Sequence, residues 1–183
     1  MIIKCYNENH DYLLFIDIEF NNLDLVQYTG LLFKWIDTET YQLMRSCNLY
    51  VTNQVCYAFA EYTSITNNFL KENGVPLEDV VDLIENNFLN GVDRSKLLLV
   101  SHGLKNDKIV LERAGLDVNM EGYCTFTNGR RILKRTNQLT LADIAEEAGY
   151  YLHEAHNAYN DAWAEVSIFT YLRKIEQQEK GEK

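Results

Sequence analysis

The sequence has little of several features that mark whole classes of proteins. It contains one proline in 183 residues and no long polar tract, which argues against a flexible linker and favours one domain. No apolar stretch approaches transmembrane length, and residues 1–11 lack the basic and apolar regions of a signal peptide. The four cysteines form no Cys-x-x-Cys pair, so we expect reduced thiols rather than disulfides or a zinc site. These absences together predict a cytoplasmic protein without membrane contact.

Positive charge is also scarce. The 17 Lys and Arg residues are outnumbered by 27 Asp and Glu residues, which gives a net charge of −10. Such a balance argues against binding nucleic acid by bulk electrostatic attraction. It does not exclude an enzyme that acts on nucleic acid, because an acidic metal site would account for several of these charges and bound cations reverse the local sign.

The first part of the chain predicts an antiparallel meander of three strands. Runs rich in apolar and aromatic residues occupy residues 12–18, 26–37 and 41–51. Residues 20–25 form a polar turn between the first two runs, and residues 37–40 have the composition of a hairpin turn.

The second part alternates helices and strands. The wholly apolar run at 97–100 predicts a strand buried on both faces, and residues 123–126 predict a last short strand. Residues 128–135 are expected to be a basic loop or turn, and a charged tail is expected to fray. Apolar spacing and capping residues predict helices near residues 64–72, 77–89, 105–114, 140–148 and 157–177. The expected fold is therefore α/β, with a mixed five-stranded sheet, helices on both faces and a ligand site at the carboxyl ends of the strands.

Two carboxylates stand at the end of the first predicted strand. Asp17 and Glu19 are one residue apart, so the alternation of a strand puts both on the same side. They repel each other unless a positive charge lies between them, and hard divalent cations take oxygen ligands. An isolated Asp-x-Glu is equally a strand end with solvated acids, so a metal site needs further ligands from the rest of the chain.

Two further acids follow predicted elements. Asp107 lies at the start of the helix that follows the strand 97–100, where any acid is favourable. Asp161 lies on the last helix, and His156 precedes it. Taken alone, Asp161 would be an ordinary helix acid and His156 a surface or capping imidazole.

Taken together, these motifs resemble the DEDDh exonucleases, which include polymerase proofreading subunits, RNase T and oligoribonuclease. The resemblance rests on Asp-x-Glu, then a strand followed by His-x-x-x-x-Asp, then a helix-borne His-x-Ala-x-x-Asp, in this order from about Tyr12 to Leu172. The tyrosine branch of the superfamily has Tyr four residues before the last Asp. Here Asn157 holds that position and His156 lies one residue earlier, as in the histidine branch. The resemblance implies a ribonuclease H-like fold and one exonuclease domain over residues 1–183, with a core at about 12–175 and a charged tail at 176–183.

The resemblance also implies an activity. The protein would be a metal-dependent 3′-5′ exonuclease that removes nucleoside 5′-monophosphates from single-stranded RNA or DNA. The acids Asp17, Glu19, Asp107 and Asp161 would hold two divalent cations, Mg²⁺ with Mn²⁺ as a substitute, and His156 would be the general base. The alternative is a non-catalytic module on the same fold that binds nucleic acid or protein. A homodimer, or a partner among polymerases and RNA-processing proteins, is compatible with either interpretation.

The sequence departs from the family beside the first motif. Many members have Thr and Gly there, whereas this chain continues with Phe20 and Asn21. We expect Phe20, Asn21 and Leu23 to contact the terminal nucleotide, although core packing would explain Phe20 and Leu23 equally well. The basic stretch around Arg130 and Arg131, which also contains Lys134 and Arg135, either binds substrate phosphates or is a solvated turn.

Overall fold

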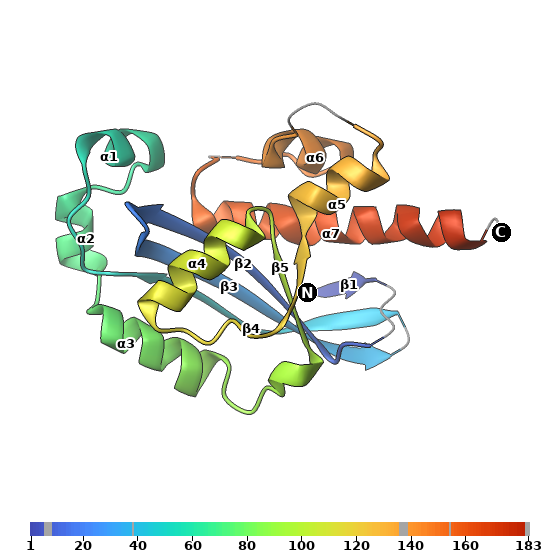
Figure 1. Cartoon of the computed structure of the whole chain (residues 1–183), viewed down its shortest axis with the longest axis horizontal. Helices are drawn as coiled ribbons and strands as arrows, with labels where there is room; N and C mark the ends of the chain where they lie inside the picture. Colours follow the sequence, from blue (N-terminus) through green and yellow to red (C-terminus); the bar gives the residue numbers. More distant parts are fainter. Residues whose placement is uncertain (6–8, 38, 136–138, 154, 182–183) are drawn as a thin grey trace.

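The predicted meander forms the first half of the sheet in the computed structural model (Figure 1). The structure describes residues 1–5, 9–37, 39–135, 139–153 and 155–181. In the meander, β2 (Tyr12–Asn21), β3 (Asp24–Asp37) and β4 (Thr40–Tyr50) pair antiparallel. The expected polar turn at 20–25 shrinks to Asn22 and Leu23, whose φ angles of 54° and 68° are the positive values that a type I′ hairpin requires. Thr38, in the expected hairpin turn at 37–40, lies outside the described residues.

Within the described residues, the sheet has six strands in the order β1-β4-β3-β2-β5-β6, not the five that the sequence predicted. The additional strand is β1 (Ile2–Lys4), which pairs with β4. Three residues are too few to show the alternation by which a strand is recognised. Beyond the meander, β5 (Leu97–Ser101) runs parallel to β2, and β6 (Glu121–Cys124) runs parallel to β5. The strand β2 therefore lies at the centre, between the antiparallel and the parallel parts of the sheet.

Helices cover both faces of the sheet, as expected. On one face, Leu13 and Phe15 of β2 pack against α7 (Ala158–Gly181), where the rings of Phe15 and Phe169 meet edge to face with centroids 5.4 Å apart. On the opposite face, the alternate residues Leu14 and Ile16 belong to a second core. That core includes residues of α3 (Leu77–Asp82), of a π-helical segment (Leu83–Phe88) that continues it, and of α4 (Leu104–Ala114). Strand alternation thus divides the apolar residues of β2 between two helical layers.

The remaining α-helices have 7 or 8 residues each. Two of them match predictions: α2 (Asn67–Asn73), capped by the Thr66 hydroxyl, and α6 (Leu141–Glu147), which begins with a capping box. The helix α1 (Tyr57–Thr63) was not predicted. The expected basic loop at 128–135 is wrong in part, because residues up to Ile132 belong to α5 (Thr125–Ile132). A short 3₁₀ turn (Arg94–Lys96) leads into β5.

The expected fraying of the charged tail is also wrong for the residues that the structure describes. The last helix α7 continues to Gly181. Its acid Glu176 binds Arg131 of α5 and Arg173 of α7 itself, so ion pairs accompany the helix where apolar contacts end. None of the helices in the described part of the chain is long and apolar enough to cross a membrane.

Gly30 in β3 provides a test of the packing between the sheet and the π-helical segment. A Cβ atom at this position would lie 2.7 Å from Cε1 of Phe88 and 3.0 Å from Cε1 of Tyr28. We expect Gly30→Ala to lower the free energy of unfolding by about 1–3 kcal/mol, because the buried Phe88 ring must move. Urea unfolding measures this change. Gly181→Ala, whose Cβ would meet no atom within 4 Å, is the matched control, and equal stabilities of the two variants would contradict the packing.

Candidate active site

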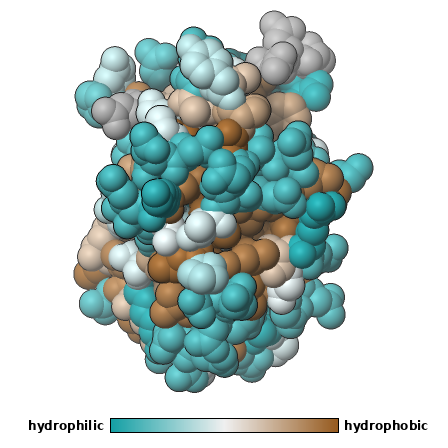
Figure 2. Space-filling view, turned by 90° about the vertical axis from the view of Figure 1, so that its left-hand side faces the viewer, coloured by the Kyte–Doolittle hydropathy of each residue, from teal (hydrophilic) through white to brown (hydrophobic). Residues whose placement is uncertain are grey.

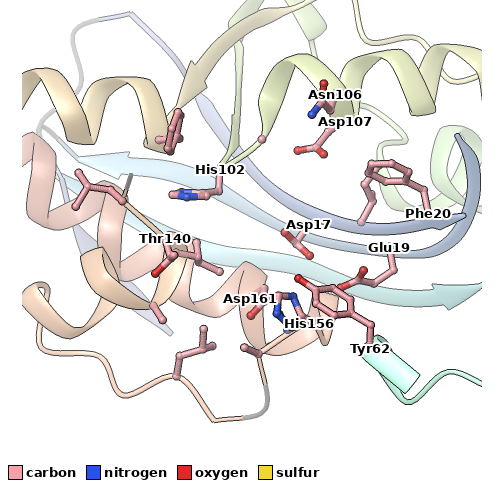
Figure 3. A pocket seen from close by; sticks show the side chains of 18 of the residues that line it. Asp17, Glu19, Phe20, Tyr62, His102, Asn106, Asp107, Thr140, His156 and Asp161 are labelled. Carbon is pink, nitrogen blue, oxygen red and sulfur yellow. The ribbon is translucent and has the colours of Figure 1, made fainter. Parts of the chain in front are cut away.

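Three parts of the chain bring acids to one cleft at the carboxyl ends of β2 and β5 (Figure 3). The strand β2 contributes Asp17 and Glu19, the first turn of α4 contributes Asp107, and the beginning of α7 contributes Asp161. His156, from the segment before α7, joins them. All five residues that the sequence singled out for catalysis therefore line the same cleft.

Asp17 and Glu19 face α7 because of strand alternation. They continue the row of Leu13 and Phe15, whose side chains pack against α7. Beyond Glu19 the β2–β3 register shifts, so that Glu19 lies opposite Gln27 and Phe20 opposite Leu25. This bulge lies where the strand leaves the core and enters the cleft, a common place for bulges beside functional sites.

Asp107 is held by the connection between β5 and α4. Gly103 precedes α4, and its carbonyl accepts the backbone N–H of Asp107 at 3.2 Å. The hydroxyl of the fully buried Ser101, the last residue of β5, donates to the Asp107 carboxylate. Burial raises the pKa of Asp107, and the Ser101 hydrogen bond partly offsets this.

Asp161 and His156 are connected through the backbone. The N–H of His156 donates to Oδ2 of Asp161 at 3.0 Å, while Oδ1 of Asp161 is buried without a hydrogen-bond partner among the described residues. His156 has a φ of 67°, which is rare for a residue other than glycine. The side chain of Asn157 accepts the N–H of Tyr159 at 3.1 Å and so caps the first turn of α7. This geometry turns the His156 ring toward the acids.

Tyr62 of α1 covers the His156 ring. The two ring centroids are 3.8 Å apart with an angle of 31° between the planes. Burial, followed by the charges of Glu19 and Asp161, raises the pKa of Tyr62. Burial also lowers the pKa of His156 below its ordinary value, so the imidazole is neutral at neutral pH.

The acids lie close together without a compensating protein cation. No lysine or arginine is among the described residues that line the cleft. Burial, followed by the charges of Asp161 and Asp107, raises the pKa of Glu19 to about 8. Burial raises the pKa of Asp161 to about 6. Asp17 has a pKa well above its ordinary range because of burial and of the charges of Asp161, Asp107 and Glu19. Such a group of carboxylates favours a bound divalent cation.

A fifth acid, Glu165, lies next to the cluster and was not predicted. It is fully buried on α7, one turn after Asp161. Its Oε1 accepts the backbone N–H of His102 at 2.7 Å, and its Oε2 is buried without a hydrogen-bond partner in the described structure. Burial, followed by the charges of Asp17 and Asp107, holds the pKa of Glu165 well above its ordinary range. The four-residue spacing from Asp161, which puts both on one helix face, was a signal that could have revealed it.

The acids offer ligands that suit a divalent metal. The carboxylates of Asp17, Glu19, Asp107 and Asp161 are hard oxygen donors, and the unpartnered Oδ1 of Asp161 is an acceptor that nothing else satisfies within the described residues. One ligand atom each of Glu19, Asp161 and His156 also lie within 4.8 Å of one another. The donor set therefore fits the cations that the sequence predicted.

The cleft has a volume of about 850 Å³, which is enough for a nucleotide and part of its neighbour. On the side of the molecule that carries α1 and α2, Figure 2 shows hydrophobic residues gathered between hydrophilic ones. The aromatic walls of the cleft come from α1 and from α5, which contribute Phe59, Tyr62 and Phe126. No local pattern in the sequence marked these three residues, because they reach the cleft through tertiary packing.

Of the predicted substrate-binding residues, Phe20 alone is among the described residues that line the cleft. Arg130 lies 5.7 Å from the centroid of Phe126, which also lines it. Leu23 lies at the hairpin turn. The side-chain amide of Asn21 donates to the carbonyl of Gln54, in the segment before α1, at 3.5 Å. Neither residue lines the cleft. Arg131 donates to the carboxylate of Glu176 at 2.5 Å.

His102 lines the cleft but is occupied by structural contacts. Its Nδ1 lies 2.9 Å from the hydroxyl oxygen of Thr125. Burial lowers the pKa of His102 to about 4, so the ring is neutral. These contacts support the helix α5, which begins at Thr125.

The raised pKa values predict an unusual pH dependence of stability. Below about pH 4, Asp and Glu bind protons in both the folded and the unfolded states. Between about pH 4 and pH 8 the unfolded chain has already lost these protons, whereas the folded protein keeps them, because the pKa values of Asp161 and Glu19 are about 6 and about 8 in the folded state. The folded state therefore becomes less stable as pH rises. In EDTA, we expect the melting temperature to fall as pH rises from 5.5 to 8, and saturating Mg²⁺ to remove the fall.

Glu165→Gln is the matched variant for this measurement. The amide oxygen of Gln can still accept the N–H of His102, but the side chain cannot ionise. We expect this variant to melt above the wild type at pH 8 in EDTA. A melting temperature of the wild type that is independent of pH in EDTA would show that the carboxylates do not repel one another.

Solved structures share this fold. Exonuclease X, solved in complex with duplex DNA carrying a 5′ overhang, matches with a TM-score of 0.65 and 16% identity over 88% of this chain and 91% of that chain. A 3′-exonuclease that recognises the 3′ end of the histone mRNA stem-loop gives a TM-score of 0.66 and 15% identity over 93% of this chain and 84% of that one. E. coli exonuclease I, in complex with a dA16 oligonucleotide, gives a TM-score of 0.71 and 12% identity. This match covers 92% of this chain but only 42% of the exonuclease I chain.

The likeness lies in structure rather than in sequence. No family model and no curated protein matches the chain. At these identities the structural matches establish the arrangement of strands and helices. The fold that the motifs predicted is thus confirmed, because the chain shares its arrangement of strands and helices with these exonucleases.

Proposed function

We propose that the protein is a metal-dependent 3′-5′ exonuclease that releases nucleoside 5′-monophosphates from single-stranded RNA or DNA. One observation carries the proposal: Asp17, Glu19, Asp107, Asp161 and His156 meet in one cleft, and no lysine or arginine among the described residues lines it. The fold shared with exonucleases that bind DNA overhangs and an mRNA 3′ end supports the same reaction. A module that only binds would gain nothing from these buried like charges.

The four acids would hold two divalent cations, Mg²⁺ or in its place Mn²⁺. Cations bound there would activate a water molecule and stabilise the attacking and leaving oxygens of a phosphodiester. Asp17 would be among the ligands of these cations; burial, followed by the charges of Asp161, Asp107 and Glu19, raises its pKa. The hydrogen bond from Ser101 orients Asp107, and the N–H of His156 orients Asp161.

His156 would be the general base that takes a proton from the attacking water. Its ring is neutral at neutral pH because burial lowers its pKa, so a lone pair is available to accept the proton. The stacked ring of Tyr62 and the positive φ of His156 limit the orientations that the imidazole can adopt. Limited orientation favours catalysis, because proton transfer requires a positioned acceptor.

The walls of the cleft would hold the 3′ end of the substrate. Phe20 and Phe126 offer aromatic faces on which bases of any sequence can stack. Arg130, whose guanidinium lies over the ring of Phe126, would contact a substrate phosphate. Asn21, Leu23 and Arg131 remain predictions for a longer substrate that extends beyond the cleft.

Removing a carboxylate tests the metal assignment. We expect Asp17→Asn and Asp161→Asn to abolish shortening of a 5′-labelled single strand, because each substitution removes a charged ligand. The wild type should give a ladder that shortens one nucleotide at a time, and EDTA should stop it. Asp79→Asn, an exposed acid on α3, is the matched control and should leave the ladder unchanged. Full activity of either cleft variant, or immediate internal fragments from a circular strand, would refute the proposed reaction.

Replacing His156 tests the base. Because φ is 67° at this position, His156→Asn preserves the backbone better than His156→Ala, since Asn tolerates the left-handed region. We expect the rate at saturating Mg²⁺ to fall by roughly 10²–10⁴-fold. The wild-type rate should decrease on the acid side as the imidazole is protonated, and the variant should lack this decrease. His153→Ala is the control, and a variant at position 156 that keeps the wild-type pH profile would remove His156 from the mechanism.

A further inference from the structure

The ring of His156 lies beside two of the carboxylates that oxygen-preferring cations would use. Each of the residues Glu19, Asp161 and His156 offers one ligand atom, and these three atoms lie within 4.8 Å of one another. Figure 3 shows the three side chains gathered at one side of the cleft, apart from Asp107. In a tetrahedral site with bonds of about 2.0–2.2 Å, neighbouring ligand atoms are about 3.4 Å apart. Rotation of the long Glu19 side chain would bring its carboxylate closer to the other two ligand atoms.

Two features show unsatisfied ligands at this place. Asp161 is 6% exposed, and its Oδ1 is buried without a hydrogen-bond partner in the described part of the chain. The ring nitrogens of His156 make no hydrogen bond to any described residue, whereas His102 contacts the Thr125 hydroxyl and His10 contacts the Glu121 carboxylate. The imidazole lies against the Tyr62 ring, and its nitrogens are therefore open to an ion.

The type of ligand selects the type of ion. Imidazole is a borderline-soft donor that suits Zn²⁺ and later transition metals, whereas Mg²⁺ prefers oxygen ligands throughout. Two carboxylates and one imidazole, with a fourth position open to solvent, form an ordinary protein site for zinc. Affinity for such a set also rises from Mn²⁺ toward Zn²⁺.

We propose that Glu19, Asp161 and His156 form a second, competing metal arrangement that binds one Zn²⁺ ion and holds the enzyme in an inhibited state. The site shares Glu19 and Asp161 with the Mg²⁺ ligands, so the two arrangements exclude each other. Coordination to zinc also occupies the lone pair of His156 that would accept a proton. The inhibition rests on the proposed exonuclease function, whereas zinc binding does not.

Calorimetric titration of the metal-free protein with ZnCl₂, without nucleic acid, tests the site. We expect one bound Zn²⁺ per chain. Loss of a supporting group around a metal costs about 10–100-fold in affinity, so loss of the ligand itself in His156→Asn or His156→Ala should cost at least about tenfold. The matched control is His153→Ala, which removes an imidazole of the same segment that is not in the cluster. Melting curves in EDTA show whether each variant is folded.

A second measurement identifies the nitrogen ligand directly. The visible absorption of bound Co²⁺, used in place of Zn²⁺, should change in both His156 variants and remain unchanged in His153→Ala. Equal zinc affinity and equal Co²⁺ spectra in the wild type and the His156 variants would overturn the proposed site, whatever the activity. Millimolar Mg²⁺ should weaken zinc binding, and independence of Mg²⁺ would contradict the shared ligands.

The inhibition is measured separately, on the wild type with saturating Mg²⁺ and a labelled single strand. Half-inhibition should occur at the zinc concentration that half-saturates the site under the same conditions. Persistent cleavage with zinc bound would overturn the inhibited state. A wild type that does not cleave in Mg²⁺ alone would refute the proposed function, while the calorimetric comparison would still decide the zinc site.

Discussion

The electrostatic repulsion among buried carboxylates is the constraint around which this end of the molecule is built. Asp17, Asp107, Asp161 and Glu165 are brought together by two cores and by one long helix, and no basic side chain of the described residues lines the cleft to relieve them. Without other interactions, burying these like charges together would lower the free energy of unfolding. The arrangement persists because α7 packs its apolar side chains, Ala162 and Phe169 among them, against the central strand. Hydrophobic burial far from the cleft therefore offsets the cost of the site.

The basic residues of this acidic chain are used mainly for structure in the region around α5. Arg131 pairs with Glu176, Lys134 with Glu179 and Arg135 with Glu147, so the cations connect α5 and the turn after it to α6 and α7. The pairs of Arg131, Lys134 and Arg135 are largely exposed and each contributes little to stability. Their effect is to leave the potential near the cleft negative, which favours cations over polyanions until metals are bound.

The group of acids and the histidine that line the cleft could be predicted from the sequence, because they belong to local patterns. One pattern is Asp-x-Glu after an apolar run, and another is the spacing of His156 from Asp161. Both are short motifs, and the periodicity of strands and helices determines where their side chains point. The strand Leu97–Ser101 was also predicted from a local pattern, because a continuous apolar run is typical of a strand that is buried on both faces.

Other features depend on contacts that no window of sequence contains. The strand β1 is stable only through its pairing with β4, and α5 begins in a polar stretch whose apolar side, including Ile132, is buried by α6 and α7. Tyr62 reaches His156 because a core formed by Val26, Val55 and Ile65 fixes the region of α1 and α2 on the sheet. Tertiary packing overrides weak local preference in each case.

The place of α7 in the chain has a consequence for biosynthesis. Asp17 and Glu19 are made early, while His156, Asp161 and Glu165 are made after all six strands. Chains emerge from the ribosome at about 5–20 residues per second, and early parts can begin to fold first. The sheet can thus assemble with its acids still exposed to water, and the charged cleft closes only when the last helix docks. A nascent chain bearing this sheet would therefore hold Asp17 and Glu19 without the neighbouring charge of Asp161, so one cause of their raised pKa values would be absent.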